Sequence, residues 1–326
     1  MRYVTFGRSG LKVSRIALGT FQFSGGWGEF DADDASDLIR TAFDSGITFF
    51  DTARAYGFGR AERLLGDALA GPLKAERDSI VIATKGGLRF AEDGRRVRDS
   101  SEAALREGLE ESLRDLGIDH VDVFLLHWPD PGIPIEETAG VLDGFVDEGL
   151  IRWHGVSNHT TAEMAPLVDH PAFAAVQPPY SLLRKSVEHD LLPFCERHEI
   201  GVMAYGTLAH GLLTGKYGPG DTFIGWRGSS PLFQGETYAT NVQMASRLAD
   251  LAAEWQLAVP ELATSWALAH PSVQTAVMGA SSGEQLQAIL SAGDVVLTEA
   301  QVGLVEELAN TGVQVGGPSP EGGVSE

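Results

Sequence analysis

Four side chains of complementary chemistry stand in three short segments of the chain. Asp51 and Tyr56 belong to Phe-Asp-Thr-Ala-Arg-Ala-Tyr-Gly, Lys85 to Thr-Lys, and His127 to Leu-Leu-His-Trp-Pro-Asp. A free phenol has a pKa near 10, but an ammonium about 4 Å away favours phenolate by roughly 4 kcal/mol, or about three pKa units. Tyr56 beside Lys85 therefore predicts a general acid. Asp51 would hold the ammonium, and His127 would bond and orient an oxygen of the substrate.

These side chains must be positioned by the eight short apolar segments that alternate with stretches of helical periodicity. The segments are rich in Val, Ile, Phe and Ala, and they predict strands at 16–18, 48–51, 80–84, 121–127, 152–156, 174–177, 201–205 and 274–278. Apolar residues at helical spacing predict helices at 34–44, 101–116, 240–255 and 260–268. This alternation predicts an α/β fold, either an open doubly wound sheet or a closed barrel.

Polar residues at the strand ends favour the barrel. Such a residue stands at or just after the carboxyl end of six predicted strands: Asp51, Lys85, His127, Ser157, Gln177 and Tyr205. A barrel brings these ends to one mouth, where barrel active sites form. An open sheet, with strands about 4.8 Å apart, would spread them along one edge. We therefore expect a (β/α)8 TIM barrel in which the first dozen residues form a hairpin that caps the barrel bottom.

We expect residues 1–310 to form this single barrel domain. Residues 218–237, which are rich in Gly, Ser, Pro and aromatic residues, predict a long loop over the mouth. Residues 311–326 contain Gly-Gly-Pro-Ser-Pro-Glu-Gly-Gly and predict a disordered C-terminal tail, because this composition cannot bury a core.

The composition is that of a globular protein with a strongly acidic surface. Hydrophobic residues make up 43% of the chain, and 24 basic against 45 acidic residues give a net charge of −21. That charge repels nucleic acid and anionic lipid, so we expect neither as a partner. No apolar run reaches the roughly 18 residues of a membrane span. Cys195 is the single cysteine, which together with the absence of a signal-peptide pattern predicts a cytoplasmic protein.

The three catalytic segments resemble the aldo-keto reductase family. Further segments resemble it in the same order, namely Leu11–Arg15 with Leu18-Gly-Thr20, Gly155-Val-Ser-Asn158, 204–217 and Gly279-Ala-Ser-Ser-Gly-Glu-Gln285. The resemblance covers residues 1–310. It implies a nicotinamide cofactor and NAD(P)H-dependent reduction of aldehydes or ketones to alcohols, or the reverse oxidation, with Tyr56 as proton donor.

The resemblance also implies which residues contact the cofactor. Ser157, Asn158 and Gln177 would hold its carboxamide and Tyr205 would stack on its ring. The backbone of residues 206–211 with Lys216 would take the pyrophosphate, and Gly279, Ser281 and Gln285 the adenosine end. The full set of expected cofactor contacts is Thr20, Ser157, Asn158, Gln177, Tyr205, Gly206, Thr207, Leu208, His210, Gly211, Lys216, Arg227, Gly279, Ser281 and Gln285.

We expect NADP(H) to be favoured over NAD(H). Lys216, Arg227, Ser281 and Gln285 would supply donors to a 2′-phosphate if the loop 218–237 folds over the adenosine end. Many members of the family carry an arginine where Ser281 stands, so this preference depends on the remaining donors.

Aromatic residues on the mouth loops suggest the substrate side of the site. We expect Phe21, Trp27 and Trp128 to contact a small carbonyl or alcohol substrate. Sugars and acidic substrates are also possible, because four arginines could bind them: Arg95, Arg96, Arg98 and Arg227. The oligomeric state is open as well.

Two other functions remain possible from the residues alone. The first is a regulatory or sensor subunit that binds NADP(H) with little turnover, as potassium-channel β subunits resembling this family do. The second is an aldolase or isomerase barrel that uses Lys85 as a Schiff base. No metal site is predicted, because the nine histidines show no His-Glu-x-x-His spacing.

Overall fold

A closed parallel barrel organises the protein. The computed structural model describes residues 1–25, 30–90 and 95–316. Among them, eight parallel strands pair in the order β3, β4, β5, β8, β9, β10, β11 and β12, and β12 closes the barrel against β3. The strands of the barrel are β3 (Ile16–Gly19), β4 (Phe49–Asp51), β5 (Val81–Gly86), β8 (Val121–Leu126), β9 (Ile151–Ser157), β10 (Phe173–Gln177), β11 (Gly201–Tyr205) and β12 (Thr275–Met278).

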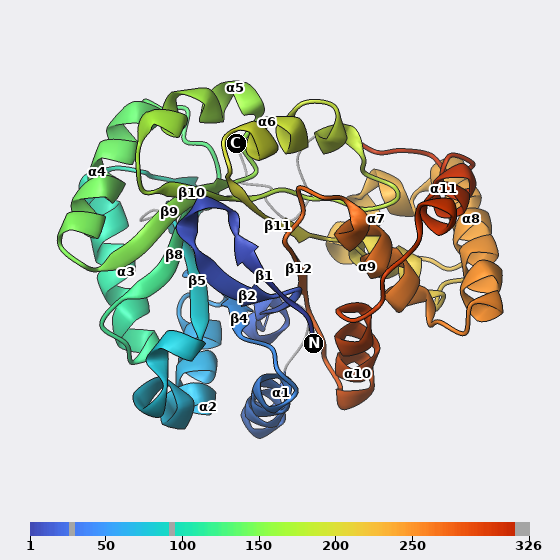
Figure 1. Cartoon of the computed structure of the whole chain (residues 1–326), viewed down its shortest axis with the longest axis horizontal. Coiled ribbons are helices and arrows are strands. Elements are labelled where there is room, and N and C mark those ends of the chain that lie inside the picture. Colours follow the sequence, from blue (N-terminus) through green and yellow to red (C-terminus); the bar gives the residue numbers. More distant parts are fainter. Residues whose placement is uncertain (26–29, 91–94, 317–326) are drawn as a thin grey trace.

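Helices cover the outside of the barrel, as Figure 1 shows. The described helices are α1 (Ala32–Asp44), α2 (Arg60–Ala75), α3 (Glu102–Leu116), α4 (Ile135–Asp147), α5 (Thr161–Met164), α6 (Leu191–Arg197), α7 (Gly225–Ser229), α8 (Gly235–Glu254), α9 (Val259–Ala269), α10 (Gly283–Ala292) and α11 (Glu299–Ala309). The predicted TIM barrel is confirmed, and so are the eight predicted strands. The four predicted helices are α1, α3, α8 and α9.

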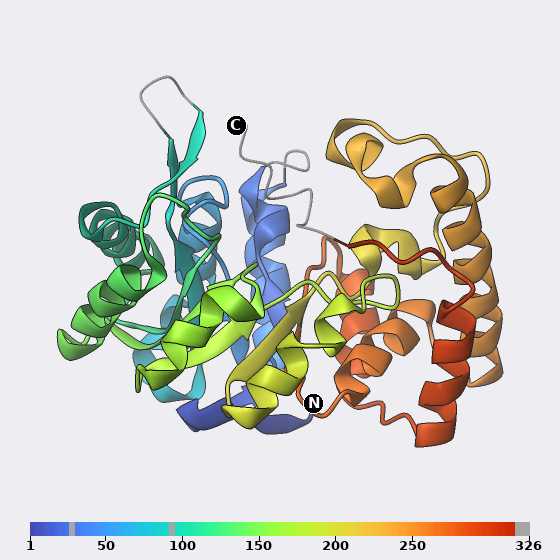
Figure 2. The same ribbon diagram turned by 90° about the horizontal axis from the view of Figure 1, so that it is seen from above.

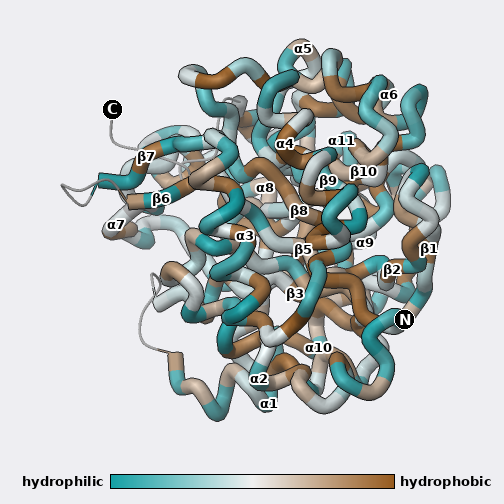
Figure 3. The backbone as a smooth tube through the Cα atoms, turned by 90° about the vertical axis from the view of Figure 1, so that its left-hand side faces the viewer, coloured by the Kyte–Doolittle hydropathy of each residue, from teal (hydrophilic) through white to brown (hydrophobic). Residues whose placement is uncertain are grey.

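The alternation of side chains along each strand separates two apolar cores. Residues that point into the barrel, such as Phe49, Val81 and Val123, form a small inner core. Their neighbours, such as Phe50 and Ile82, pack against the helices in the larger outer core. Figure 3 shows hydrophobic stretches of the backbone trace among the central strands. Every second side chain of a strand points inward, so the row of inward side chains on each strand continues at the carboxyl end into the mouth of the barrel.

A hairpin closes the other end of the barrel. The strands β1 (Tyr3–Phe6) and β2 (Leu11–Ser14) pair antiparallel around the turn 7–10. The Phe6 ring lies edge-on to Phe49, with the ring centres 5.6 Å apart, and it fills the bottom of the inner core. Gly7 lies so close to the start of β11 that a Cβ there would lie 2.3 Å from the Gly201 nitrogen. The predicted cap on the barrel bottom is therefore confirmed.

A second hairpin rises at the mouth and was not predicted. It consists of β6 (Leu88–Phe90) and β7 (Arg96–Arg98), which pair antiparallel after β5. Figure 2 shows this hairpin and the N-terminal hairpin at opposite ends of the barrel. Each of its strands has only three residues and is rich in arginine, so the alternation is too short to reveal them in the sequence.

The long loop after β11 is more ordered than expected. It contains the short helix α7, and α8 already begins at Gly235 within the stretch predicted as loop. Four aromatic rings hold it together by packing at centre distances between 4.7 and 6.3 Å: Tyr217, Phe223, Phe233 and Tyr238. Aromatic packing, which composition alone does not reveal, is the reason for the difference.

The first residues of the predicted C-terminal tail are ordered. Asn241 of α8 accepts a hydrogen bond from the Val313 nitrogen (2.7 Å) and donates one to the Val313 oxygen (3.2 Å). The Val315 nitrogen donates to the Leu183 oxygen at 2.9 Å. Residues 311–316 are therefore docked, which corrects the expected disorder for them, because buried polar groups on the barrel satisfy their backbone. Residues 317–326 lie outside the described part of the chain.

Within the described residues, no helix combines the length and the apolar character that a membrane crossing requires.

Candidate active site

The buried Lys85 ammonium is the centre of the polar cluster at the mouth. Its Nζ atom lies 2.8 Å from both carboxylate oxygens of Asp51 and 2.8 Å from the Thr52 carbonyl oxygen. The Tyr56 hydroxyl lies 3.3 Å from the same nitrogen. Burial lowers the pKa of Lys85, while the Asp51 carboxylate opposes that fall. The acceptors around Nζ engage its protons, so this lysine is arranged as a charge and not as a nucleophile.

The strands explain why these side chains meet. Asp51 ends β4 and continues the inward row of Phe49, and Lys85 continues the inward row of Val81 and Ala83 on β5. β4 and β5 are neighbours in the barrel, with Asp51 opposite Ala83. Lys85 therefore projects toward Asp51 from the next strand, one step closer to the mouth.

A second buried carboxyl group supports this pair from outside the barrel. Glu62, on α2, has no exposed surface and accepts a hydrogen bond from Thr84 Oγ1 at 2.7 Å. It also lies 3.4 Å from Arg54, which in turn pairs with Glu111 of α3 at 2.7 Å. Burial raises the pKa of Glu62. Because Arg54 precedes Tyr56 and Thr84 precedes Lys85, this network fixes the loop of Tyr56 against β5.

The imidazole of His127 completes the set of four. His127 follows β8, and its ring lies edge-on to the Tyr56 ring with centres 5.8 Å apart. Burial lowers the pKa of His127 well below its ordinary value, and the positive charges of Lys85 and Arg96 lower it further. The ring is therefore neutral at pH 7. Its Nδ1 atom is buried without a partner among the described residues.

Hydrogen bonds join the ends of β9, β10 and β11 to this set. The Asn158 side chain donates to the His127 oxygen and to Ser157 Oγ, both at 3.1 Å, and accepts from the Tyr205 hydroxyl at 2.7 Å. Ser157 Oγ donates to the Gln177 oxygen at 3.0 Å. Asn158 has a positive φ of 62°, which an asparagine tolerates better than most residues. Expected cofactor residues and the His127 loop thus form one network.

Gln177 connects the far side of the barrel to the catalytic set. Its Nε2 atom donates to Asp51 Oδ1 at 2.8 Å, so its side chain belongs to the Asp51 and Lys85 cluster. This contact spans the barrel interior, since Gln177 ends β10 and Asp51 ends β4. The amide and the ammonium share the Asp51 carboxylate.

The loop after β11 combines left-handed backbone with nearby positive charges. Ala209, His210 and Gly211 all have positive φ, at 46°, 57° and 95°. Two of them are not glycine, and a positive φ costs such a residue about 1–2 kcal/mol of backbone strain. Strain of this kind often marks functional loops. Arg227 donates to the His210 oxygen at 3.4 Å, and a Cβ on Gly211 would lie 3.4 Å from Lys216 Nζ. Two cations therefore flank this turn.

The remaining expected residues lie at the ends of β3 and β12. Thr20 is buried after β3 with its hydroxyl unpartnered among the described residues, and the Gln22 side chain contacts Gly279 after β12. Ser281 donates through its nitrogen (2.9 Å) and its hydroxyl (3.0 Å) to the Gln285 side chain at the start of α10. Unsatisfied buried polar atoms are rare, and the orphaned hydroxyl fits a mouth that receives a polar ligand.

Two of the three expected substrate residues lie beside the catalytic set. The Phe21 ring lies 5.0 Å from the Tyr56 ring, edge to face. Trp128 is buried directly after His127, with the Arg98 guanidinium 5.4 Å from its ring centre. Trp27 lies outside the described residues.

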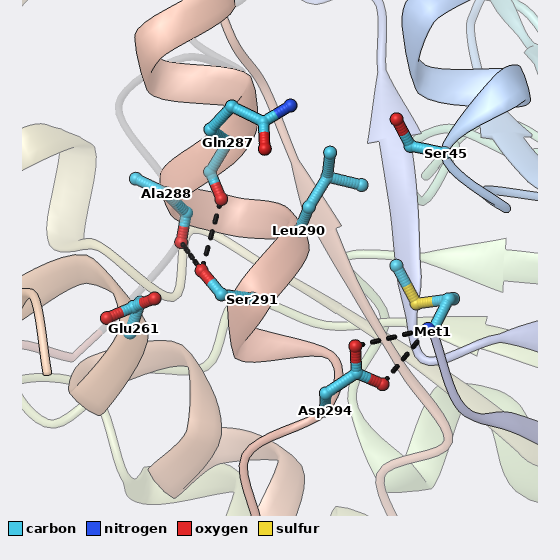
Figure 4. Close-up of a pocket in the computed structure, with 8 residues that line it drawn as sticks. All are labelled: Met1, Ser45, Glu261, Gln287, Ala288, Leu290, Ser291 and Asp294. Carbon is cyan, nitrogen blue, oxygen red and sulfur yellow. Dashed lines mark hydrogen bonds and ion pairs between the residues drawn. The ribbon is translucent and has the colours of Figure 1, made fainter.

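A separate surface pocket of about 570 Å³ lies away from this mouth. It is lined by residues of the N-terminus, α9, α10 and the segments that follow α1 and α10, and Figure 4 shows the Met1 amine bound to the Asp294 carboxylate at its edge. None of the residues that line it is an expected site residue. The lining residues are Met1, Ser45, Glu261, Gln287, Ala288, Leu290, Ser291 and Asp294. Since Met1 precedes the bottom hairpin, this pocket belongs to the end opposite the catalytic set.

Sequence reasoning missed Glu62, Thr84 and Gln22, and it missed the hairpin that holds Arg96 at the mouth. Glu62 and Thr84 depend on which helix packs behind β5, a tertiary fact that no local pattern contains. Arg96 lies on the unpredicted hairpin.

These features define a class of protein. A parallel barrel carries a phenol, an ammonium, a carboxylate and a neutral imidazole at its carboxyl end, next to a strained turn flanked by cations. The family model described as "Aldo/keto reductase family" matches residues 15–310. The chain belongs to this family, whose members are NAD(P)-dependent oxidoreductases that act on carbonyl and alcohol groups.

Relatives of known name agree with this membership. The chain is 36% identical to "Aldo-keto reductase YhdN" of Bacillus subtilis (strain 168), over 89% of this chain and 88% of that protein. It is 32% identical to the "NADH-specific methylglyoxal reductase" of Escherichia coli (strain K12), over 95% and 98%. The solved structure of the glycerol dehydrogenase AKR11B4 from Gluconobacter oxydans superposes with a TM-score of 0.85 at 32% identity, covering 94% of this chain and 95% of that one.

Proposed function

We propose that this protein reduces small aldehydes and ketones to alcohols with NADPH, using Tyr56 as the proton donor. The observation that carries the proposal is the Lys85 ammonium, which lies 3.3 Å from the Tyr56 hydroxyl and is fixed by Asp51. A positive charge at this distance stabilises phenolate and makes the phenol a stronger acid.

The chain's own residues then divide the work. His127 is neutral, so its ring can donate a hydrogen bond to the carbonyl oxygen of the substrate without losing a proton to solvent. Tyr56 protonates the same oxygen, and Lys85 stabilises the phenolate that remains. Phe21 and Trp128 exclude water from the reacting oxygen, which strengthens both interactions.

A nicotinamide cofactor fits the residues around this set. Ser157, Asn158 and Tyr205 would hold the nicotinamide end, and Gln177 would lie behind it on Asp51. The turn from Gly206 to Gly211, with Thr207, Leu208, His210 and Lys216, would take the pyrophosphate, and Thr20, Gly279, Ser281 and Gln285 would border the rest. The cofactor supplies a hydride, two electrons and one hydrogen, to the carbonyl carbon, while the oxygen receives its proton from Tyr56.

Lys216 and Arg227 support the preference for NADP(H) over NAD(H). Both cations flank the turn that would take the pyrophosphate, and a 2′-phosphate at the adjoining adenosine end would find charge-assisted donors in them in an otherwise acidic protein. Two such hydrogen bonds, each worth about 1.5–3 kcal/mol, give a preference of roughly 10²-fold or more. The Escherichia coli relative is named as NADH-specific, so the preference needs its own measurement.

Titration of the protein's fluorescence with NADPH and with NADH measures the cofactor preference directly. We expect tighter binding of NADPH, and we expect Arg227→Gln to weaken NADPH while leaving NADH unchanged. Equal dissociation constants would reject the cofactor preference without touching the proposed chemistry.

The test of the chemistry is Tyr56→Phe. We expect cofactor binding to persist and turnover of a panel of aldehydes, ketones and keto-sugars to fall about 10²–10⁴-fold, the usual contribution of a positioned acid. Steady turnover by the unmodified protein separates an enzyme from a cofactor-binding regulatory subunit. Near-normal turnover by Tyr56→Phe would reject the role of Tyr56.

A further inference from the structure

The hairpin of β6 and β7 has two different faces. Its strands pair Leu88 with Arg98, Arg89 with Val97, and Phe90 with Arg96. Directly paired residues of an antiparallel ladder share a face, and successive residues alternate between faces. Phe90, Arg96 and Arg98 therefore lie on one face, and Arg89 lies on the other.

Contacts show that the first face is turned to the mouth. The Phe90 ring stacks on Phe58, two residues after Tyr56, with ring centres 4.0 Å apart. Arg98 packs over Trp128 and donates to the Pro129 oxygen at 3.2 Å, beside His127. Figure 2 shows the hairpin standing at this end of the barrel.

Arg96 occupies the same face, directly opposite Phe90 in the register. Its side chain is exposed, and it has no hydrogen bond or ion pair within the described residues. Arg89, on the other face, is paired instead with Asp99 at 2.6 Å. The charge of Arg96 is also close enough to His127 to lower the pKa of that ring.

An unpaired guanidinium at the rim of a carbonyl site has a definite chemistry. Its planar donors match the two oxygens of a carboxylate or phosphate, and such charge-assisted pairs are stronger than neutral ones. The net charge of −21 repels anions at long range. At an ionic strength of about 0.15 M, however, charges more than about 8 Å apart are largely screened, so the nearest cation dominates.

We propose that Arg96 binds the anionic group of the substrate, and that the preferred substrates are small aldehydes carrying a carboxylate or a phosphate. This inference rests on the proposed carbonyl reduction and adds its substrate class. Arg98 and Phe90 hold the hairpin so that Arg96 faces the rim between the Tyr56 and His127 loops.

Paired substrates test the proposal. Succinic semialdehyde is compared with its methyl ester, and glyceraldehyde 3-phosphate with glyceraldehyde, at about 0.15 M salt. We expect the unmodified protein to favour at least one anionic member in kcat/KM by about tenfold or more, mainly through KM. The pair that shows the preference identifies carboxylate or phosphate as the group that is bound.

The matched variants are Arg96→Gln and Arg89→Gln, which remove one charge each from opposite faces of the same hairpin. Arg96→Gln should abolish the preference for the anion, mainly by raising KM for the charged member of the pair. Arg89→Gln should retain the preference. Equal kcat/KM for charged and neutral members in the unmodified protein, or equal losses in both variants, would overturn the assignment.

Calorimetric titration with succinate separates this inference from the proposed function. We expect succinate to bind the unmodified protein and Arg89→Gln, and to bind Arg96→Gln at least about tenfold more weakly. Succinate binding that depends on Arg96 supports the anion site even if no carbonyl is reduced, an outcome that would reject only the proposed reduction. Succinate binding that is equal in all three proteins overturns the anion site.

Discussion

Replacing Lys85 by methionine removes the charge next to Tyr56 while keeping an unbranched side chain of similar length. At 3.3 Å and an effective dielectric near 20, the ammonium favours the phenolate by about 5 kcal/mol. This corresponds to between about three and four pKa units of the phenol. We expect turnover to fall at least about 10²-fold, because a weaker acid transfers its proton more slowly.

The pH profile of kcat distinguishes this effect from a general loss of structure. In the unmodified protein, reduction should decline at alkaline pH as Tyr56 loses its proton. In Lys85→Met, that alkaline limb should move upward by about three pH units, following the pKa of the phenol. The assay follows the absorbance of reduced nicotinamide at saturating aldehyde and cofactor from neutral to strongly alkaline pH.

Lys85→Met alone leaves the buried Asp51 carboxylate without its cation, which costs about 3–5 kcal/mol of stability. The double variant Asp51→Asn, Lys85→Met removes both charges and serves as the folded control. We expect it to regain most of the melting temperature but not the turnover. An alkaline limb that does not move in either variant would refute the reasoning, and so would full activity of the double variant.

Three further outcomes follow from contacts outside the catalytic set. Asn241→Ala should lower the free energy of unfolding by about 1–3 kcal/mol, because it leaves the docked Val313 backbone unpaired. Urea unfolding measures this change, and an unchanged free energy of unfolding would mean that the segment does not dock in solution. His127, His154 and His159 have pKa values lowered mainly by burial. The unfolded chain therefore binds more protons below about pH 6.5, and stability should be complete above that pH and decrease below it by up to about 1.4 kcal/mol per pH unit for each histidine. Equal unfolding free energies at pH 7 and 5.5 would contradict this. Activity should survive exhaustive chelation, because the described residues contain no cluster of His, Cys, Asp or Glu suited to a metal; loss with EDTA and recovery with Zn²⁺ or Mg²⁺ would reject that expectation.

The barrel could be predicted because its evidence is local and repeated. Each strand is a short apolar run, and its side chains alternate, so a polar residue in the inward row at the carboxyl end must enter the mouth. Asp51 and Lys85 follow this rule, and the structure places them 2.8 Å apart. The same rule places Gln177 at the mouth. It does not predict the hydrogen-bond partner of Gln177, because the bond to Asp51 crosses the barrel.

The missed features depend on packing between distant segments. Glu62 is an acidic residue near the start of a helix, a position that sequence reasoning places in solvent. The structure buries it completely because α2 packs behind β5, where Thr84 and Arg54 satisfy its oxygens. α2 itself is obscured by Pro72 in its last turn. The mouth hairpin is equally hidden, because each of its strands has only three residues and arginine is frequent in both.

Because the single native cysteine is buried, a cysteine introduced at the mouth could be labelled selectively. Cys195 is fully buried in α6, and burial raises the pKa of its thiol to about 12, so the native protein should not react with maleimides at neutral pH. A cysteine introduced at Arg89, on the outer face of the hairpin, would then be the only reactive thiol. A fluorophore there would lie on the mouth hairpin without removing any native residue from the core, and a change in its emission would report a ligand that binds at the mouth.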